Sequence, residues 1–418
     1  MTKTDIINTA FKVWGQDFYR TTSLSQISSA LEVSKTALYR HFKDKDALLE
    51  EMYIAYFDEF SLYIKESYQK AIKCTDSMES CLTMMRTFAE FYLLNGEKFL
   101  FSLIQVYNRK ESDKINKEFL ERGIDIKLLS YGKDTNKVFP SKFHLIMVTL
   151  IFWIAQYHQQ NSERNCPPSR EEVKKTIDEI EVYIVKGLGL DSNTADDIDF
   201  KKLEDQVKNS NTNEDNDNSL LTAVMAAVAE AGPWNVSMEM VARHSGLSKS
   251  GLYAHFFNKQ DMLEKLFLSE FTVIISKAKE QIETSLIPEE QLYLGIISIA
   301  NHLRTHPEFL MSLEWLKTRK SFLLKLALDK LQELIGNIQL EHIIKQDQQY
   351  LITIAQWILF MIVSTLAWWP YIHNRIITDN NGSTILLSDT WKEIVREIPN
   401  DTFRTLFRFI AFGTEGLN

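Results

Sequence analysis

Apolar residues recur at three- and four-residue intervals along almost the whole chain, which is the spacing of one face of an α-helix. Phe88, Phe91 and Tyr92 form one such set, and the leucines of residues 323–331 form another. We find no convincing alternation of apolar and polar residues and no Asn-Gly turn between strand-like runs. Glycine (14) and proline (8) are also scarce among the 418 residues, although turn-rich β proteins need many of both. The pattern predicts an all-α fold.

The chain also contains an internal repeat. Residues 34–50 read SKTALYRHFKDKDALLE and residues 248–264 read SKSGLYAHFFNKQDMLE, with nine of seventeen positions identical at a constant offset of 214. The match continues upstream, in LSQISSALEV (24–33) and MEMVARHSGL (238–247), and weakly downstream, in NGEKFLFSL (95–103) and THPEFLMSL (305–313). Each half ends in a helical stretch that runs into glycine, YIVKGLG and FIAFGTEG. The chain therefore contains a duplication.

The repeated segment predicts three helices and the start of a fourth. In the first copy, residues 4–16 form a packing helix whose inner face holds Ile7, Ala10, Phe11 and Trp14. Ser23 caps a second helix, with Gln26 completing a capping box and Ile27, Ala30 and Leu31 facing inward. Ser34 follows a tight turn at Glu32 and Val33 and caps a very short third helix, and Asp44 caps a fourth that starts with Lys45.

The short third helix exposes residues suited to nucleic acid. Its Leu38, with Phe42 one turn later, points to the core, which turns Lys35, Thr36, Tyr39 and Arg40 outward. Such a face can enter the major groove, where arginine pairs with guanine edges, while lysine, tyrosine and capped helix starts contact phosphates. The alternative is a tight corner in an ordinary helical protein. The duplication argues against it, because Ser, Lys, Leu, Tyr, His, Phe and Lys recur in place.

These segments resemble the recognition helix and following helix of TetR-family regulators, and TTSLSQISSALEV and NVSMEMVARHSGL resemble the positioning helix. The resemblance covers about 50 residues in each half and implies, twice over, a three-helix DNA-binding domain followed by a helical ligand-binding and dimerisation domain. It implies DNA contacts from Thr22, Ser23, Lys35, Thr36, Tyr39, His41 and Lys45, with Arg40 added from its chemistry, and from Ser237, Lys249, Ser250, Tyr253, His255 and Lys259. Glu32 departs from the family's usual glycine, which Gly246 keeps in the second copy, so we expect some backbone strain at Glu32.

The net charge of −9 is compatible with DNA binding because the acidic residues are concentrated in one segment. Residues 191–218 hold nine acidic residues against three lysines, whereas residues 34–45 hold four basic residues against one aspartate. A local basic face is enough for DNA. Little of the acidic segment is expected to be buried, although residues around 200–207 can form a short helix. The expected domains are residues 1–50 and 219–265 for the helix-turn-helix modules, 51–190 and 266–418 for the helical regulatory domains, and 191–218 for an acidic linker.

The family resemblance implies pairing through a four-helix bundle, formed by residues 144–158 and 170–188 with 351–369 and 390–411. The two halves are expected to pair within one chain as a pseudo-dimer, although a homodimer of chains is an alternative. A linker of about 28 residues has a coil dimension of roughly 30 Å and a reach of about 90 Å, against the roughly 34 Å between recognition helices. Since the copies differ at positions 36, 37 and 40 against 250, 251 and 254, each module is expected to recognise a different half-site of an asymmetric operator.

Residues 351–369 are nineteen long and uncharged, so they could span a membrane, and a membrane-associated helical protein is the alternative function. A helix buried at an interface is favoured, because Gln356 interrupts the run and no basic cluster flanks it. His302 and His306 could share a metal ion, and Cys74 and Cys81 could sense redox state. Structural roles are favoured for both pairs, and no metal or cofactor is expected.

An apolar effector pocket, if present, is expected to use aromatic residues from both halves, the candidates being Phe88, Tyr92, Tyr107, Trp153, Trp315 and Trp357. No phosphate loop, HExxH, CxxC or nucleophile elbow is present, so an enzyme is not expected. The three cysteines (Cys74, Cys81 and Cys166) and the absence of a signal-like N-terminus indicate the cytoplasm. The sequence thus predicts a cytoplasmic DNA-binding regulator, a repressor by the family's usual mode, that responds to a small apolar effector or has lost that response.

Overall fold

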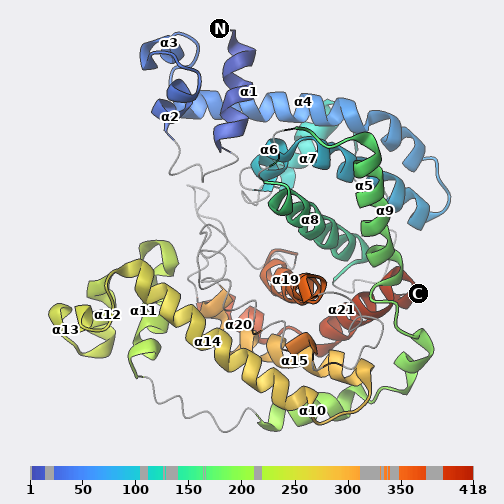
Figure 1. Ribbon diagram of the computed structural model, residues 1–418, viewed down its shortest axis with the longest axis vertical. Coiled ribbons are helices and arrows are strands. Elements are labelled where there is room, and N and C mark those ends of the chain that lie inside the picture. Colours follow the sequence, from blue (N-terminus) through green and yellow to red (C-terminus); the bar gives the residue numbers. More distant parts are fainter. Residues whose placement is uncertain are drawn as a thin grey trace. The chain divides into compact units, whose positions relative to one another are not determined.

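The computed structural model describes residues 2–14, 23–103, 112–125, 128, 140–162, 164, 166–210, 219–310, 330, 334–336, 338, 348–372 and 389–417. Every regular element in these ranges is a helix (Figure 1), which confirms the all-α prediction. The chain divides into two units, residues 1–137 with 142–182 and residues 138–141 with 183–418. The division falls inside the helix of residues 170–186.

The helices of the first unit are α1 (Lys3–Trp14), α2 (Leu24–Ala30), α3 (Lys35–Tyr39), α4 (Lys45–Ala71), α5 (Ser77–Leu94), α6 (Gly96–Phe101), α7 (Ser112–Glu121), α8 (Lys142–Gln160) and most of α9 (Arg170–Lys186). The second unit holds α10 (Phe200–Ser210), α11 (Ser219–Asn235), α12 (Met238–Ser245), α13 (Lys249–Tyr253), α14 (Lys259–Ile282), α15 (Pro288–Thr305), α19 (Gln348–Ile372), α20 (Asp389–Arg396) and α21 (Asn400–Phe412). Two short 3₁₀ helices, η4 (Ser192–Asp197) and η5 (Gly413–Leu417), complete the second unit.

The first unit has a core rich in aromatic rings. Phe60 of α4 stacks on Tyr56 and on Tyr92 of α5, with ring centroids 5.6 and 5.4 Å apart. The Tyr56 and Tyr92 hydroxyls lie 2.6 Å apart and satisfy each other inside this core. Phe11 of α1 meets Phe101 of α6 edge-on at 4.9 Å. Such pairs contribute about 0.5–1.5 kcal/mol each beyond the apolar area they bury, so the same core fixes α1 and the long helix α4.

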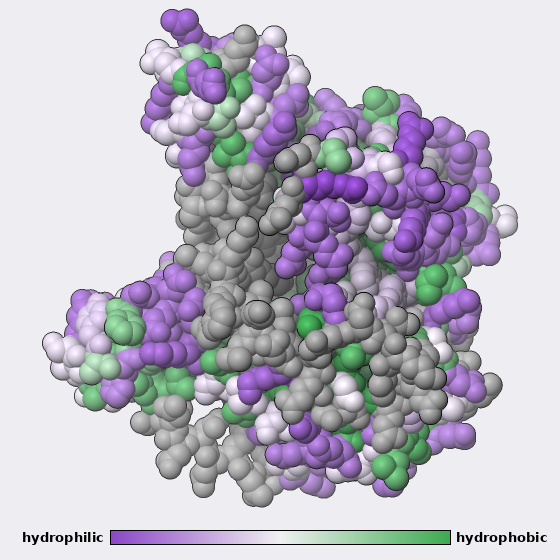
Figure 2. All heavy atoms as spheres, viewed as in Figure 1, coloured by the Kyte–Doolittle hydropathy of each residue, from purple (hydrophilic) through white to green (hydrophobic). Residues whose placement is uncertain are grey.

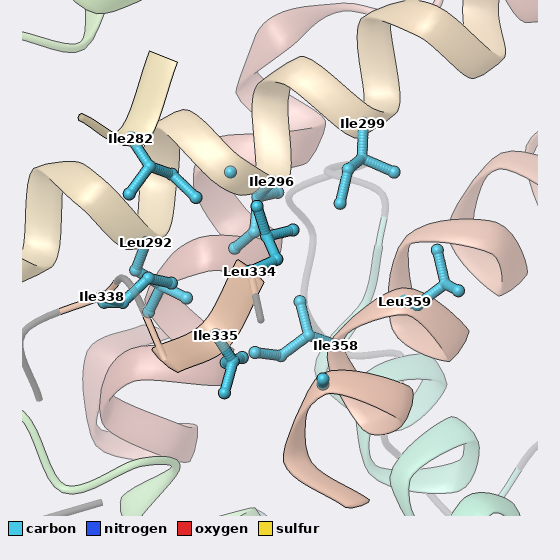
Figure 3. A pocket seen from close by; sticks show the side chains of 11 residues that line it. Ile282, Leu292, Ile296, Ile299, Leu334, Ile335, Ile338, Ile358 and Leu359 are labelled. Carbon is cyan, nitrogen blue, oxygen red and sulfur yellow. The ribbon is translucent and has the colours of Figure 1, made fainter. Parts of the chain in front are cut away.

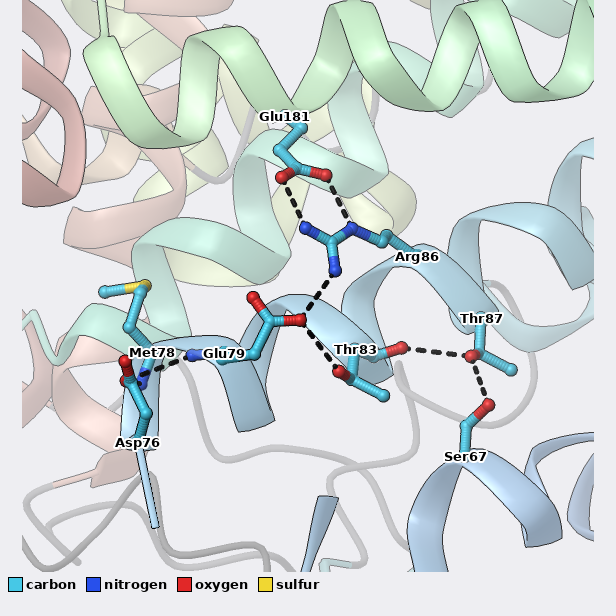
Figure 4. Close-up of polar contacts among 8 residues, drawn as sticks. All are labelled: Ser67, Asp76, Met78, Glu79, Thr83, Arg86, Thr87 and Glu181. Atoms are coloured by element: carbon cyan, nitrogen blue, oxygen red, sulfur yellow. Dashed lines mark hydrogen bonds and ion pairs between the residues drawn. The ribbon is translucent and has the colours of Figure 1, made fainter. Parts of the chain in front are cut away.

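An arginine on α5 ties that helix to α9. Arg86 donates from Nε and Nη2 to the two carboxylate oxygens of Glu181, at 2.7 and 2.6 Å, and from Nη1 to Glu79 at 2.9 Å (Figure 4). The hydroxyl of the next residue, Thr87, donates to Ser67 of α4 at 2.7 Å. The bidentate geometry fixes the register between α5 and α9.

The second unit is organised around α15, which packs on α10, α14, α19, α20 and α21. All ten residues from 291 to 300 are buried, as expected for a helix that has neighbours on every side.

The described part of the acidic segment, residues 191–210, contains a helix that packs on the second unit. Residues 200–210 form α10, which confirms the short helix expected there, and Leu203 and Val207 are buried in the second unit. Phe200 packs edge-on against Tyr293 at 4.8 Å, and Glu204 accepts two hydrogen bonds from Arg404, at 2.7 and 2.8 Å. The expectation that little of residues 191–218 is buried is therefore wrong for this helix, because apolar residues at i, i+3 and i+7 outweigh the local repulsion. Residues 211–218 lie outside the described ranges.

Helix α19 is the only described helix that is long and apolar enough to cross a membrane, over residues 349–369. In the structure, 61% of its most apolar window is buried inside the protein. Trp357 is fully buried and Tyr183 packs on its ring at 5.5 Å. Burial against protein accounts for this apolar sequence without a membrane, which agrees with the interpretation favoured from the sequence.

The expected single helix over residues 390–411 is two helices in the structure. Helix α20 ends at Arg396, and α21 begins at Asn400 with Pro399 as its N-cap. Proline lacks an amide hydrogen and disfavours helical backbone at the residue before it, so Pro399 is the reason for the break.

The ends of α9 and α21 meet through two glycines inside the second unit. Gly187 and Gly413 have φ values of +57° and +65°. A Cβ on Gly187 would lie 2.4 Å from the carbonyl oxygen of Ile410, and one on Gly413 would lie 2.2 Å from that of Val185. The Leu188 amide donates to the same Ile410 oxygen at 2.8 Å. Only glycine combines this backbone conformation with so close an approach.

Candidate nucleic-acid interface

Side-chain caps define each short helix of the first module. Ser23 Oγ accepts from the Gln26 amide at 3.3 Å while Gln26 Oε1 accepts from the Ser23 amide at 2.6 Å, which completes the expected capping box. Ser34 caps α3 through the amide of residue 37 at 3.2 Å, and Asp44 caps α4 through the amide of residue 47 at 2.8 Å. Each cap is worth about 1 kcal/mol, so the boundaries of these short helices are set locally.

The core of the first module sets which side chains remain outside. Ile27, Leu38 and Phe42 are buried, as are the expected inner residues of α1. Ala30 is instead exposed and Leu31 half-buried, because α2 ends at Ala30 and its inner face is carried by Leu24, Ile27 and Ser28. With Leu38 turned inward, the opposite face of α3 and the residues after it are exposed, which leaves the following side chains on the surface: Ser23, Lys35, Thr36, Tyr39, Arg40 and His41.

Lys45 lies at the first position of α4 and is half-buried. Its Nζ is 5.8 Å from the centre of the Trp14 ring, a cation–π contact. Burial lowers the pKa of Lys45, and the carboxylate of Asp46 opposes that shift. Thr22 lies outside the described residues.

The second module repeats this construction. Ser237, Ser248 and Asn258 cap α12, α13 and α14, each through the amide three residues on. Val241, Leu252 and Phe256 are buried in place of Ile27, Leu38 and Phe42. Of the expected contact residues, Lys249, Ser250, Tyr253 and His255 are exposed, and Ser237 and Lys259 are half-buried. In both units, the second and third helices of the module lie at the N-terminal end of a long helix, α4 or α14 (Figure 1).

The turn between the second and third helices is built from different residues in the two modules. Glu32 adopts φ +55° and is the non-glycine residue with positive φ in the described chain, while Gly246 adopts +71°. The sequence predicted this difference from the departure at Glu32. Left-handed backbone costs a residue with a Cβ about 1–2 kcal/mol, so the first copy carries strain that the second avoids.

Two features of the second module were missed from the sequence, although the constant offset makes them visible. Glu239 stands where the first copy has Ser25, and its carboxylate is hydrogen-bonded to Lys249. Phe257 stands where the first copy has Lys43, and it is 86% exposed. The tip that carries α12 and α13 accordingly mixes hydrophilic and hydrophobic surface (Figure 2). The two modules share their architecture but not their surface chemistry.

In the first unit, the candidate effector residues that the structure describes pack against other aromatic rings. Tyr92 is buried, and Phe88 and Trp153 are half-buried. Phe88 packs on Phe60 and Trp153 on Phe152, with ring centroids 5.3 and 5.4 Å apart. Tyr107 and Trp315 lie outside the described residues.

The second unit holds an apolar cavity of about 20 Å³ (Figure 3), lined by Ile282, Leu292, Gly295, Ile296, Ile299, Leu334, Ile335, Ile338, Ala355, Ile358 and Leu359. Trp357, the candidate on α19, is buried but does not line it. The lining is aliphatic, and the sequence pattern emphasised aromatic rings instead. A cavity of this size has room for about one water molecule.

The histidine and cysteine pairs singled out in the sequence pack against neighbouring side chains or lie on the surface. The His302 and His306 rings stack with centroids 4.4 Å apart, and His302 Nε2 lies 3.3 Å from Glu270 of α14. No group of three His, Cys, Asp or Glu side chains that could hold a metal ion occurs among the described residues. Cys81 is buried, which raises the pKa of its thiol to about 12, whereas Cys74 is exposed.

Comparison with known proteins identifies the modules. The family of bacterial regulatory proteins, tetR family, matches residues 6–52 and 220–266, which span α1 to the start of α4 and α11 to the start of α14. No curated protein matches the chain.

Three solved structures are similar to parts of the chain. The TetR family transcriptional regulator PfmR from Thermus thermophilus has 18% sequence identity and a TM-score of 0.31, and the match covers 46% of this chain and 94% of that one. The fatty acid degradation regulator FadR from Bacillus halodurans has 15% identity and a TM-score of 0.32, covering 44% of this chain and 99% of that one. FadR from Bacillus subtilis in complex with stearoyl-CoA has 18% identity and a TM-score of 0.32, covering 43% of this chain and 97% of that one. With its duplicated family match, the chain is a tandem TetR-like protein, a DNA-binding regulator that carries two TetR-family modules in one polypeptide.

Proposed function

We propose that this protein is a cytoplasmic transcriptional repressor that binds an asymmetric operator, with one module on each half-site. One observation carries the proposal: the two modules share their caps and core but differ at equivalent positions on the outer face of the recognition helix. The differing pairs are Thr36 and Ser250, Ala37 and Gly251, and Arg40 and Ala254. The second copy keeps the equivalents of Ser23, Lys35, Tyr39, His41 and Lys45, whose side chains suit phosphate contacts, and changes these three positions, which we assign to base recognition.

The DNA contacts are proposed to come from the capped helix starts and from the side chains around them. Helix N-termini attract phosphate through unpaired amides, and each module offers two at its exposed tip. The proposed set is Thr22, Ser23, Lys35, Thr36, Tyr39, His41 and Lys45 in the first module and Ser237, Lys249, Ser250, Tyr253, His255 and Lys259 in the second, with Arg40 as the side chain that pairs with guanine.

Selection of bound sequences from a random duplex library tests the proposal. The wild-type chain should select two unlike half-sites, one with a guanine that Arg40→Ala no longer prefers, at a cost of about 1–3 kcal/mol in binding. Ala254→Arg should make the selected half-sites more alike. Lys70→Ala, an exposed change at the far end of α4, is the matched control and should select the wild-type sequence. A symmetric wild-type site with equal half-site affinities would falsify the asymmetric interpretation.

We further propose that the two halves pair within one chain. The contact between the ends of α9 and α21 supports this, because these are the equivalent helix ends of the two copies. Beside the two glycines, the Leu190 amide donates to the carbonyl oxygen of Ala411 at 3.2 Å. Tyr183 of α9 also donates to the Tyr350 hydroxyl at 3.1 Å. Light scattering of the chain bound to its operator should give one 48.7 kDa chain per duplex, and an obligate dimer of chains would contradict the proposal.

A small apolar effector is proposed to act through the second unit. The aliphatic lining of its cavity supports an apolar ligand, but drug-sized ligands need about 300–1,000 Å³, so binding would have to enlarge it. A series of saturated fatty acids should raise the thermal midpoint of the wild-type chain and not that of Ala355→Phe, which fills the cavity. If no member of the series shifts the midpoint or releases DNA, the effector proposal fails while the DNA-binding proposal stands.

A further inference from the structure

The second module contains an ion pair between its two DNA-facing helices. Glu239 lies in the first turn of α12, two residues after the cap Ser237, and Lys249 is the first residue of α13. The Lys249 ammonium donates to the Glu239 carboxylate, and both side chains are more than half exposed, at 53% and 61%. The pair therefore lies on the surface that the proposed function assigns to DNA.

The Glu239 carboxylate interacts with groups that a phosphate would use. The pKa of Glu239 is lowered first by the hydrogen bond from Lys249, then by its own backbone amide, by the charge of Lys249 and by the Ser237 hydroxyl. The same pair raises the pKa of Lys249. Both partners are consequently charged at neutral pH. A lysine, a serine hydroxyl and the amides of a helix start are the usual ligands of a DNA phosphate.

The first module lacks this arrangement. The residue equivalent to Glu239 is Ser25, which is exposed, and the first turn of α2 contains no acidic residue. Lys35, the equivalent of Lys249, makes no ion pair with any residue that the structure describes. The two modules therefore differ in whether a carboxylate already neutralises the first lysine of the recognition helix.

We propose that Glu239 acts as an internal phosphate mimic that weakens DNA binding by the second module. The inference rests on the proposed function and states which of the two modules binds DNA more strongly. The first engages the DNA backbone directly, whereas the second must exchange the Glu239 carboxylate for a phosphate. Glu239 is thus a residue that sets the balance between the two half-sites.

Two measurable consequences follow. Repulsion between Glu239 and the DNA backbone, and the cost of breaking the pair, both oppose binding. An exposed ion pair is worth at most about 1 kcal/mol, so removing it should strengthen DNA binding by up to about fivefold. A lysine that is already neutralised releases fewer counterions from the DNA, and each full phosphate contact adds about 0.9 to the slope of log affinity against log salt.

The test measures the affinity of the full-length chain for a labelled duplex of mixed sequence at several salt concentrations. Glu239→Gln should bind up to about fivefold more tightly, with a salt slope steeper by about 0.9. Ser25→Glu, the matched change in the first module, should weaken binding by a similar factor and flatten the slope. A carboxylate in a first helical turn stabilises the helix by only about 0.3–1 kcal/mol, so removing it in Glu239→Gln or adding it in Ser25→Glu should leave both variants folded, which circular dichroism checks.

A double-mutant cycle locates the effect. Lys249→Ala should cost little in the wild-type chain and clearly more in the Glu239→Gln background, because only there does Lys249 contact phosphate without competition. Unchanged or weaker binding by Glu239→Gln, with wild-type binding intact and salt-dependent, overturns the Glu239 proposal alone. If neither the wild-type chain nor any variant binds the duplex, the proposed function fails together with it.

Discussion

The first module exposes a basic surface from Ser34 to Lys45, with four basic residues against one acidic residue, while the equivalent stretch of the second module holds two lysines. Phe257 replaces Lys43, Ala254 replaces Arg40, and Glu239 pairs with Lys249. The buried positions differ far less: Leu38 and Leu252 are identical, as are Phe42 and Phe256.

This contrast separates two kinds of constraint on the same helices. Caps and core residues determine whether a short helix forms and how it is oriented, so both copies need them. Surface charges determine how strongly the module meets an anionic partner, and they can differ between copies without loss of the fold. Duplication inside one chain therefore allows two modules of one architecture and unequal affinity.

The largest expected effect concerns the point where the two copies meet. Gly413→Ala should lower the stability of the second unit by about 3–5 kcal/mol, since a Cβ would overlap the Val185 carbonyl in a backbone conformation that already disfavours it. Gly189→Ala is the matched control, because Gly189 also has positive φ, at +69°, but has nothing within 4 Å of its added Cβ. Hydrogen exchange in α21 is the measurement, and equal effects of the two variants would argue against the close contact.

A smaller loss of stability is expected when the arginine–glutamate contact of each unit is broken, and the loss should differ between Arg404–Glu204 and Arg86–Glu181. Glu204 is buried and also accepts from the Tyr293 hydroxyl at 2.6 Å, whereas Glu181 is less buried and shares Arg86 with Glu79. Glu204→Gln should therefore cost about 2 kcal/mol and Glu181→Gln about 1 kcal/mol. Urea unfolding monitored by hydrogen exchange in α10 and α9 measures each loss in its own unit.

The Glu204 contact should also depend on pH. Burial tends to raise the pKa of Glu204, but the hydrogen bonds from Arg404, Tyr293 and Asn400 outweigh it, and the net pKa is lowered. A carboxyl whose pKa is lowered by folding contributes its full stability above the unfolded value of about 4.3 and loses it as pH falls through the folded value. The stability gap between wild-type and Glu204→Gln should accordingly close on acidification below about pH 4, and a constant gap would contradict this account.

The smallest effect concerns the turn between the second and third helices of each module. Glu32→Gly should stabilise the first module by about 0.5–1 kcal/mol, because it removes left-handed strain at some cost in chain entropy. The reverse change in the second module, Gly246→Ala, should destabilise it by about 1 kcal/mol, since nothing crowds the added Cβ and only the backbone conformation opposes it. Limited proteolysis of the two modules measures both signs in one assay.

Much of the fold could be predicted because its determinants are local. The Ser23 and Gln26 capping box, the inward Leu38 and the strained turn at Glu32 each follow from a few neighbouring residues, and all three occur in the structure. The repeat was equally accessible, because it needs only the chain compared with itself.

The rest depends on contacts between distant residues. The partners of Glu204 lie about 90 and 200 positions away along the chain, so its acidic segment looked like a solvated linker. The break before α21 is visible in the sequence at Pro399, but the single helix over residues 390–411 was expected from the family resemblance and not from this local signal. Glu239 and Lys249 are ten positions apart on two different helices, and their pairing becomes informative only when the two copies are compared position by position.

The glycine contact between α9 and α21 has a consequence for how the protein is made. Gly187 leaves the ribosome more than 200 residues before Gly413, which at about 5–20 residues per second is a delay of roughly 10 to 45 s. Throughout that interval the amide of Leu188 lacks the carbonyl it pairs with in the finished chain. The end of α9 is consequently synthesised without a partner that only α21 supplies, and a nascent chain stalled in α19 would still expose that unpaired helix end.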